Sequence, residues 1–552
     1  MKTTPSPWQL IRPYWSSEEK WRAWGLLALI IVLDLGTVYC AVQISTWQKN
    51  FFDALSEYQR ELISPLMWRL AGLIALTTFC ATFSIFFRQL LEIRWRSWVT
   101  EDYLARWTRK HAYQRIESAR LADNPDQRIA EDLALMAGKT LDLGLGLLKN
   151  LVNAVSFAVI LWGLSGSLPL TAIGLDIELP GYMLWAAILY AALGSWLMEK
   201  IGKPMVGLDY RQQQYEADFR YLLVRMRENA EQIAFYRGEA IEHNRLRNAF
   251  HAIRQNWRGL MTYTKRVAFT ESVYIEVGSI LPYLISIPRY FAKQITIGGV
   301  MQLSVGFSRL RTALSWFLFN YKELALLRSA LRRLGEFDAV LRQPQVSGIR
   351  LVQSEHANLR THGLNLQRPD GSPLSAIADI EVRPGERWLV RGPSGIGKST
   401  LLRALAGLWP YGDGRIELPR GSQLFLPQKS YLPPGSLKDA LCYPAAAETF
   451  DDAQCARALG LVQLPQYTKR LHESDHWEKR LSPGEQQRLA FARVLLHRPD
   501  YLFLDEASSA LDAQNEDNLY RLLDEHLPAS TVVSVAHHAS LERYHQRRLD
   551  IG

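Results

Sequence analysis

Long apolar runs alternate with charged segments over the first 340 residues. A bilayer core requires about 20 mostly apolar residues in an α-helix. Runs close to this length predict six membrane-spanning helices, at residues 23–42, 70–87, 151–175, 181–198, 269–288 and 295 to about 321, with a short turn at residues 165–167. The first run is longer than the apolar core of a signal peptide, and no clear small-residue cleavage site follows it. We therefore do not expect a signal peptide.

Charged residues interrupt three of these runs. The first run contains Asp34, the fifth contains Glu271 and Glu276, and the sixth contains Arg309 and Arg311. Charged residues inside spans usually face a cavity or a partner rather than lipid. We therefore predict that Glu271, Glu276 and Arg309 belong to a substrate pathway. The alternatives are an intramembrane salt bridge, or charges that lie just outside the bilayer.

The distribution of Lys and Arg predicts the topology, because cytoplasmic loops are enriched in both. Residues 165–180 contain neither, and the loop after the first run has only Lys49 and Arg60 before Arg69. The loop after the second run is strongly basic, with Arg88, Arg94, Arg96, Arg106, Arg109, Lys110, Arg115 and Arg120. We expect the N-terminus, both long loops and the C-terminal half in the cytoplasm. The apolar periodicity of the long loops predicts that the spanning helices continue into the cytosol.

Composition narrows the class of protein further. The 552 residues are 48% hydrophobic and 22% charged, which excludes a disordered or fibrous chain. The net charge of +9 follows the predicted membrane topology, so no nucleic-acid partner is needed to explain it. Cys40, Cys80, Cys442 and Cys455 are far apart in the sequence without a C-x-x-C pair. We therefore expect buried thiols and neither a disulfide scaffold nor a cysteine metal site.

The pattern changes near Gly348 to short β-rich runs, glycine turns and helices. This change predicts two domains, a helical transmembrane domain over residues 1–340 and an α/β domain over residues 348–552. A buried strand at 388–390 precedes a G-x-x-x-x-G-K-S segment, and a helix follows. The expected nucleotide-binding residues of this phosphate loop are Gly392, Pro393, Ser394, Gly395, Ile396, Gly397, Lys398, Ser399 and Thr400.

The chemistry of the phosphate loop explains its composition. Glycines let backbone N–H groups close around phosphate, and the start of the following helix adds its dipole. Lys398 neutralises the outer phosphates of ATP, and the Ser399 hydroxyl can bind Mg²⁺. A chance glycine loop is the alternative, but the strand–loop–helix context disfavours it.

Two carboxylates end the apolar strand at 501–505. Asp505 is placed to hold Mg²⁺, and Glu506 is placed to polarise the water that attacks the γ-phosphate. A solvated turn is the alternative for two such acids. We predict Glu506 as a catalytic residue and Asp505 as a metal-binding residue.

Residues 481–488 predict the start of a helix. Ser482 can cap it, Pro483 fits the first helical position, and Glu485 can complete a capping box. This segment resembles the signature of ATP-binding cassettes (ABC), and Ser482, Gly484 and Glu485 keep the family pattern, whereas Pro483 replaces a glycine. The resemblance implies that all three of these residues contact ATP.

The resemblance extends over the last ~200 residues in the order of the family's motifs. Gln428 resembles the glutamine that touches Mg²⁺ and senses the membrane domain, and residues 509–512 resemble the D-loop. His537 resembles the switch histidine that contacts the γ-phosphate, which implies a catalytic role. The position of the family's usual adenine-stacking aromatic residue falls near Arg368, so either this guanidinium or another residue stacks on adenine instead.

The membrane half carries a second resemblance. Residues 47–55, 93–100 and 123–129 resemble the SbmA/BacA family of bacterial inner-membrane proteins. Residues 229–239 are similar to the coupling loop of peroxisomal fatty-acyl ABC half-transporters. Chains that join such a membrane domain to a cassette resemble the YddA and BacA-like ABC transporters.

Together these resemblances imply an ABC half-transporter with a type IV exporter fold, in which six transmembrane helices precede a P-loop cassette. They imply a homodimer in the bacterial inner membrane, in which Ser482 and Gly484 complete the opposite ATP site. The implied function is uptake of peptides, peptide antibiotics, cobalamin or similar hydrophilic compounds. A transporter of fatty acids or their CoA esters, and a membrane ATPase that senses a ligand, stay open as alternatives.

Overall fold

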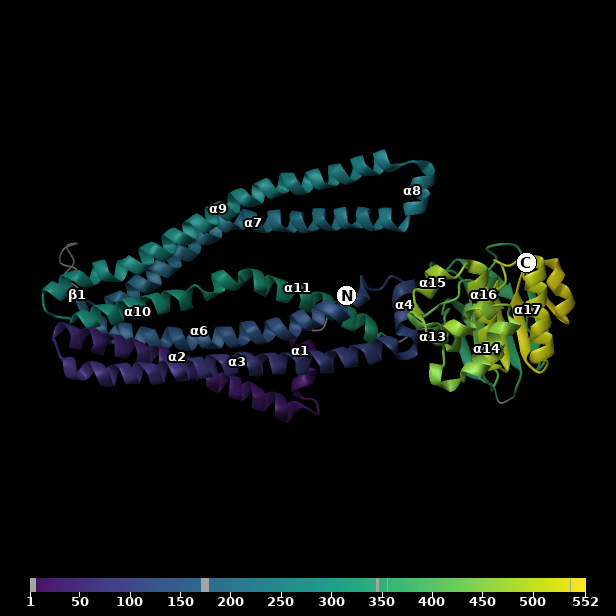
Figure 1. The fold of residues 1–552 in the computed structure, drawn as a ribbon, viewed down its shortest axis with the longest axis horizontal. Coiled ribbons are helices and arrows are strands. Elements are labelled where there is room, and N and C mark those ends of the chain that lie inside the picture. The colour runs from purple at the N-terminus through teal and green to yellow at the C-terminus, as the bar shows by residue number, and fades with distance from the viewer. Residues whose placement is uncertain (1–5, 170–177, 344–346, 355, 537) are drawn as a thin grey trace. The chain divides into compact units, whose positions relative to one another are not determined.

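The computed structural model describes residues 6–169, 178–343, 347–354, 356–536 and 538–552. They form two compact units, one of residues 1–107 and 122–341 and the other of residues 108–121 and 342–552. We refer to them as the membrane unit and the cassette unit (Figure 1). The short helix α4 (Ala112–Ser118) lies between two long helices in the sequence but belongs to the cassette unit. There Arg115 Nη1 donates a hydrogen bond to the Gln343 carbonyl oxygen at 2.7 Å.

The membrane unit is built from long helices. Its main elements are α1 (Pro7–Trp15), α2 (Lys20–Ser56), α3 (Arg60–Thr108), α6 (Leu133–Ser165), α7 (Tyr182–Glu228), α8 (Ala230–Tyr236), α9 (Glu239–Phe291), α10 (Ile297–Leu314) and α11 (Trp316–Arg342). A short helix α5 (Pro125–Gln127) and a π-turn at Arg128–Asp132 lead into α6. The small hairpin of β1 (Ser167–Pro169) and β2 (Glu178–Pro180) connects α6 to α7.

Each of the six predicted spans corresponds to a helix, with one difference in extent. The short turn predicted at residues 165–167 of the third run is confirmed, since α6 ends at Ser165 and Gly166 adopts a φ of +62°. Residues 170–177 of that prediction lie outside the described residues. The sixth predicted span is interrupted, since Ser315 separates α10 from α11.

Within the described part of the chain, four helical segments are long and apolar enough to cross a membrane. They contain α2, α3, α6 and α7. The helices α9 and α10 carry the charges noted above and fall short of this criterion. Nevertheless α10 packs against α2, α6, α7 and α9, and its Leu303 and Phe307 are buried with Phe157 and Leu161 of α6. This helix is therefore at the centre of the membrane unit.

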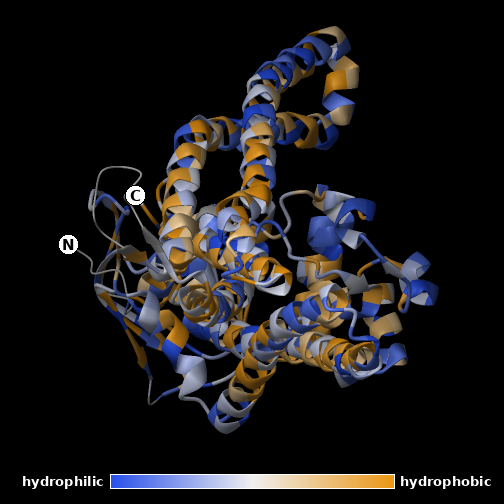
Figure 2. Ribbon diagram, turned by 90° about the vertical axis from the view of Figure 1, so that its left-hand side faces the viewer, coloured by the Kyte–Doolittle hydropathy of each residue, from blue (hydrophilic) through white to orange (hydrophobic). Residues whose placement is uncertain are grey.

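The helices α7 and α9 pack along one another as a hairpin closed by α8 (Figure 1). The 53 residues of α9 extend about 80 Å, far more than a bilayer core of about 30 Å. Polar residues are interspersed along the hairpin towards α8 (Figure 2). Both helices therefore continue well beyond the predicted spans, and the location of these extensions in the cytosol stays a prediction.

The cassette unit contains a parallel sheet with the strand order β14-β7-β13-β12-β9. Its strands are β7 (Arg387–Arg391), β9 (Gln423–Leu426), β12 (Tyr501–Asp505), β13 (Thr531–Val535) and β14 (Arg547–Asp550). A second, mixed sheet contains β3 (Ile349–Gln353), β4 (Leu359–Gln367), β5 (Pro373–Ile377), β6 (Glu381–Val382) and β8 (Gly412–Leu418). The predicted strands at 388–390 and 501–505 are confirmed.

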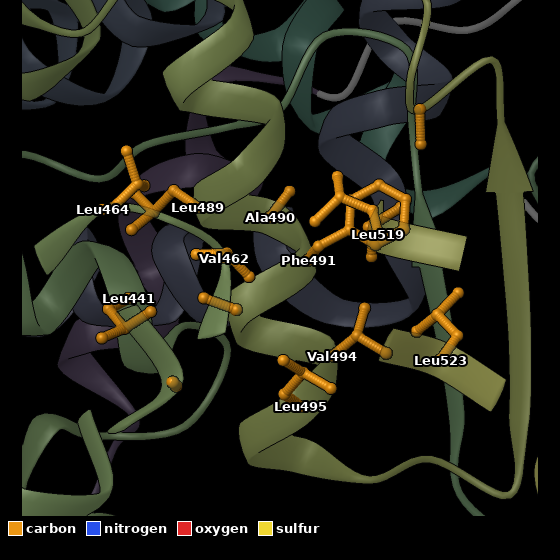
Figure 3. Packing of buried hydrophobic residues seen from close by; sticks show 14 of the residues in the cluster. Leu441, Val462, Leu464, Leu489, Ala490, Phe491, Val494, Leu495, Leu519 and Leu523 are labelled. Carbon is orange, nitrogen blue, oxygen red and sulfur yellow. The ribbon is translucent and has the colours of Figure 1, made fainter. Parts of the chain in front are cut away.

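Helices complete the cassette unit. They are α12 (Lys398–Leu405), α13 (Leu437–Cys442), α14 (Asp452–Leu461), α15 (Trp477–Arg480), α16 (Pro483–His497) and α17 (Ala513–His526), and β10 (Gly435–Ser436) pairs with β11 (Ser474–Asp475). Phe491 and Val494 of α16 lie towards Leu519 and Leu523 of α17, whereas Leu489 lies towards Leu464, and all belong to one apolar core (Figure 3). This packing fixes the position of the helix that follows Ser482.

Candidate active site

The phosphate loop connects β7 to α12 at the carboxyl edge of the parallel sheet. Gly395 and Gly397 have φ values of +81° and +111°, which a residue with a side chain rarely adopts. The Lys398 side chain is buried and turns back over the loop. Its Nζ donates hydrogen bonds to the carbonyl oxygens of Gly392 at 2.8 Å and Pro393 at 3.1 Å. The ammonium group is thus already held over the loop that binds phosphate.

Ser399 and Asp505 face each other across this edge of the sheet. The Ser399 hydroxyl donates a hydrogen bond to Asp505 Oδ1 at 2.7 Å. Burial raises the pKa of the Asp505 carboxyl, an effect that the Ser399 hydrogen bond partly opposes. A hydroxyl beside a half-buried carboxylate is a set of oxygen ligands that suits Mg²⁺.

Glu506 and Gln428 form the second pair. The Gln428 side-chain amide donates a hydrogen bond to Glu506 Oε2 at 3.0 Å. The two residues meet because β9 and β12, which precede them, are parallel neighbours. Glu506 has a φ of +48°, and its N–H donates to the Val535 carbonyl at 3.0 Å. The strand end therefore turns sharply and holds Asp505 and Glu506 towards different partners.

Ser482 forms the N-cap of α16, as predicted. Glu485 N–H donates to Ser482 Oγ at 3.3 Å, and Ser482 N–H donates to Glu485 Oε2 at 2.9 Å, which completes the capping box. Tyr467 also donates to Glu485 Oε1 at 3.0 Å. Burial opposes ionisation of Glu485, but these hydrogen bonds outweigh it and lower the pKa of the carboxyl. Both carboxylate oxygens of Glu485 thus accept hydrogen bonds from the same chain.

The signature and the phosphate loop are not joined within one chain. Among the described residues, no hydrogen bond connects Ser482 or Gly484 to the loop at 392–399. Gly484 instead lies against the D-loop segment, where an added Cβ would be 3.3 Å from the Ala510 carbonyl oxygen. The predicted switch histidine, His537, lies outside the described residues.

Gln487 is a structural connection that motif matching alone did not single out. Its buried side chain accepts a hydrogen bond from Ala510 N–H at 2.9 Å and lies 3.3 Å from Ser509 Oγ. It therefore ties the signature helix to the D-loop. The sequence feature that could have indicated this role is the position of Gln487 in the signature run, three residues after Gly484.

A second unpredicted cluster is centred on Glu516. Its buried carboxylate accepts a hydrogen bond from the Ser508 hydroxyl at 2.7 Å and lies 2.9 Å from His538 Nδ1. This cluster ties the D-loop side of α17 to the segment after β13. Nothing in its sequence spacing pointed to it.

The Arg368 side chain is exposed at the turn between β4 and β5. Its Nη1 donates hydrogen bonds to Ser372 Oγ at 3.2 Å and to the Pro373 carbonyl oxygen at 3.1 Å. These contacts hold the guanidinium within its own turn. Stacking of Arg368 on adenine stays a prediction.

The predicted pathway residues do not come together. Glu276 and Arg309 are exposed, and Glu271 is half-buried. Within the described ranges, none of the three forms an ion pair. Arg311 is different, because its buried Nη1 donates to the carbonyl oxygens of Tyr274 and Ile275 on α9, both at 3.1 Å.

Asp34 does have partners, as expected of a charge inside a span. Its Oδ1 accepts a hydrogen bond from the Ser84 hydroxyl at 2.9 Å and lies 3.5 Å from Lys149 Nζ. The contact joins α2, α3 and α6. Asp34 and Lys149 therefore form a salt bridge between α2 and α6.

All four cysteines are buried and free, as predicted. Although Cys442 and Cys455 are separated in the sequence, their sulfur atoms lie 3.8 Å apart between α13 and α14. In the part of the chain that the structure describes, no cluster of three or more His, Cys, Asp or Glu side chains is arranged to hold a metal ion.

Two family descriptions match the chain. "ABC transporter transmembrane region 2" matches residues 10–291, and "ABC transporter" matches residues 377–509. The first match covers half of the chain and falls within the membrane unit. The second includes the phosphate loop, the signature and the strand that ends at Asp505.

Similar proteins span nearly the same length. The chain is 34% identical over 531 residues to Escherichia coli (strain K12) "Inner membrane ABC transporter ATP-binding protein YddA", covering 96% of this chain and 94% of that protein. It is 27% identical to the Homo sapiens "Lysosomal cobalamin transporter ABCD4", covering 97% and 92%. A solved bacterial Atm1-family ABC exporter with ATP bound has a TM-score of 0.74 at 17% identity, covering 97% of this chain and 94% of that chain, which shows the fold.

Proposed function

Because this chain belongs to the ABC transporter family and carries one membrane unit and one cassette, we propose that it works as a homodimer. ABC transporters couple ATP hydrolysis to transport, and the chain is an ATPase of this kind. The observation that carries the proposal is the separation of the signature from the phosphate loop within one chain. Ser482 and Gly484 would complete the site of a second copy.

Exposed aromatic residues on α8 support the same assembly. Phe235 and Tyr236 at the end of the α7–α9 hairpin are 79% and 87% exposed. Large apolar groups gathered at an exposed tip are typical of protein-binding surfaces. A second copy of the chain would supply a surface to cover them.

The geometry assigns roles to the cassette residues. Lys398 leaves the loop carbonyls to neutralise the outer phosphates of ATP. Ser399 and Asp505 would hold Mg²⁺, which when bound supplies charge neutralisation for phosphoryl transfer. Glu506 accepts a proton from the attacking water, and Gln428 orients the Glu506 carboxylate through the hydrogen bond described above.

The chain is a multi-pass protein of the inner membrane with its cassette in the cytoplasm, as in the E. coli relative. We propose that the transported substrates are hydrophilic compounds such as peptides, peptide antibiotics or cobalamin. The support is the similarity over nearly the whole chain to a human protein described as a cobalamin transporter. Uptake is the proposed direction.

Flux into proteoliposomes tests this proposal. Vesicles with ATP on the cassette side would receive labelled cobalamin, a labelled peptide antibiotic or a labelled acyl-CoA in parallel. We expect ATP-dependent uptake of cobalamin or the peptide, and none with the matched Glu506→Gln protein. Flux of acyl-CoA alone would support the fatty-acid alternative. ATPase stimulation without flux of any compound would favour a sensor and contradict the transport proposal.

Cross-linking tests the homodimer separately. A cysteine introduced at Ser482 and another in the phosphate loop at Ser394 should cross-link between chains when ATP and Mg²⁺ are present in the Glu506→Gln background. Each single-cysteine protein is the control. Cross-linking exclusively within one chain would contradict the proposed assembly.

A further inference from the structure

The membrane unit contains a cavity of about 770 Å³ between α2, α6, α9 and α10. Its walls come from the last turn of α6, the end of α9 and the first turn of α10, together with Lys49 near the end of α2. A cavity of this size suits a small organic ligand, since ligand sites range from about 300 to 1,000 Å³. The cassette chemistry does not use it.

Three cationic side chains line this cavity: Lys49, Arg289 and Lys293. Within the described ranges, no carboxylate lies within 4 Å of any of these three groups. The acid nearest in the sequence is Asp53, one turn beyond Lys49, and its Oδ1 accepts a hydrogen bond from Gly298 N–H at 2.9 Å. Among the described residues, the cavity lining therefore carries more positive than negative charge.

The structure positions one of these cations firmly. Arg289 Nε donates to the Gln294 side-chain oxygen at 3.1 Å, and its Nη1 donates to the carbonyl oxygens of Leu164 and Ser165. The guanidinium is thus held against the end of α6 by neutral groups. A planar cation without a carboxylate partner is well suited to bind a carboxylate or a phosphate.

The start of α10 forms part of the cavity wall. Thr296, which lines the cavity, caps this 18-residue helix by accepting a hydrogen bond from Gly299 N–H at 3.1 Å. The Asp53 carboxylate balances the partial positive charge of this helix end, so the positive charge of the cavity comes from its three cationic side chains. Leu164, Phe291 and Ile295 supply an apolar wall beside these cations.

We propose that this cavity binds an anionic group, a phosphate or a carboxylate, that is attached to an apolar chain. Both a transported molecule and a lipid headgroup have this chemistry. The inference rests on the proposed function for one point, the location of this end of the helices on the outer side of the membrane. If a transported molecule is the source, the site disfavours strongly cationic peptides as substrates.

Binding of octyl phosphate to the full chain in phosphatidylcholine nanodiscs tests the proposal. We expect the wild-type protein to bind this probe, and the Lys49→Gln/Lys293→Gln protein to bind it at least about tenfold more weakly. The matched control is Lys203→Gln/Lys265→Gln, which removes two exposed charges from α7 and α9 of the same unit. It should change the affinity less than about twofold. Any binding of the probe to the ATP site is common to all three proteins and cancels in the comparison.

The same titration in phosphatidylglycerol nanodiscs separates the two sources. Loss of octyl phosphate affinity there in the wild-type protein alone identifies the lipid headgroup as the occupant. Unchanged affinity identifies a molecule from solution. Equal affinity of the wild-type and the double-variant proteins, or an equal loss in the control, would overturn the site. The proteoliposome flux experiment described above reports separately on the proposed function, since the binding titration does not depend on transport.

Discussion

The cassette and the membrane unit place their charged residues in different ways. In the cassette, Lys398, Asp505 and Glu506 gather at one edge of a parallel sheet and leave room for a charged ligand. In the membrane unit, several carboxylates are neutralised from a second helix, as Asp34 is by Lys149 and Asp132 is by Arg333. A sheet edge collects side chains from several strands, whereas two packed helices bring together one pair at a time.

This difference predicts different consequences of mutation. A cassette charge acts on the nucleotide, so its loss affects turnover or affinity more than folding. A paired charge in the membrane unit balances a buried partner, so its loss leaves an uncompensated charge in an apolar environment. The substitutions below separate these two behaviours.

The largest effect is expected for Glu506→Gln. Because the amide cannot accept the proton of the attacking water, ATP hydrolysis should fall about 1,000-fold, equivalent to about 4 kcal/mol. ATP binding should persist, and the protein should stay a closed, ATP-bound dimer. Steady-state phosphate release and direct ATP titration measure the two properties. Glu525→Gln on the exposed face of α17 is the control. Near-normal turnover of Glu506→Gln would contradict the assignment of Glu506 as the catalytic residue.

Asp132→Asn tests a paired charge of the membrane unit. Asp132 is buried, and it accepts hydrogen bonds from Arg333 at 2.5 and 2.9 Å and from Arg128 at 3.0 Å. Removing its charge should cost about 3 kcal/mol of stability, because Arg333 loses its counter-charge and Arg128 keeps only the contact with Asp123 at 3.7 Å. Thermal unfolding in detergent measures the loss. Exposed Asp126→Asn should have little effect, and an equal Tm for both variants would contradict the comparison.

Lys398→Ala should weaken ATP binding about 30-fold, since a charge-assisted contact contributes about 2 kcal/mol. Turnover should fall as well, while the unfolding temperature without nucleotide should change little. Titration with ATP provides the measurement, and exposed Lys469→Ala provides the control. Unchanged ATP affinity would show that Lys398 is not the cation of the phosphate site.

Glu271→Gln and Glu276→Gln address the predicted pathway in the membrane unit. If either carboxylate contacts substrate, a coupled proton or a basic partner such as Arg309, transport should fall roughly threefold, for ~0.6 kcal/mol per polar contact. Basal ATPase activity should be retained. Glu239→Gln on the same helix is the control. Wild-type transport by both single variants and the double variant would show that these charges are only solvated.

The smallest effect is expected at His545. Burial lowers the pKa of this imidazole, although its contact with the Leu541 carbonyl acts in the opposite direction. The folded protein therefore binds this proton less readily than the unfolded chain, so stability falls as the pH drops below about 6.5. His545→Gln should reduce that acid sensitivity in thermal unfolding, and exposed His356→Gln should not. The same pH dependence in both variants would contradict this prediction.

Local patterns predicted the cassette site well. The phosphate loop, the strand ending at Asp505 and the cap at Ser482 each depend on consecutive residues, and the structure forms all three. Gln428 required the resemblance to a family, because its contact with Glu506 joins strands 78 residues apart. Gln487 was missed because its role depends on the fold of the D-loop.

The membrane unit was predicted only in outline. Apolar runs located its helices, because hydropathy is a local property. They did not predict that Asp132 pairs with Arg333, since these residues are 201 positions apart and no period connects them. The break at Ser315 was also missed, because the apolar run continues across it.

The length of the α7–α9 hairpin converts a small rotation at one end into a large displacement at the other. Arg311 attaches α9 to α10 close to Gly278, where an added Cβ would collide with the guanidinium. From Gly278 to Glu239 the helix extends about 58 Å, at ~1.5 Å per residue. A rotation of about one degree around Gly278 therefore moves α8 by about 1 Å. Small adjustments around one arginine are therefore amplified at the aromatic tip, tens of ångströms away.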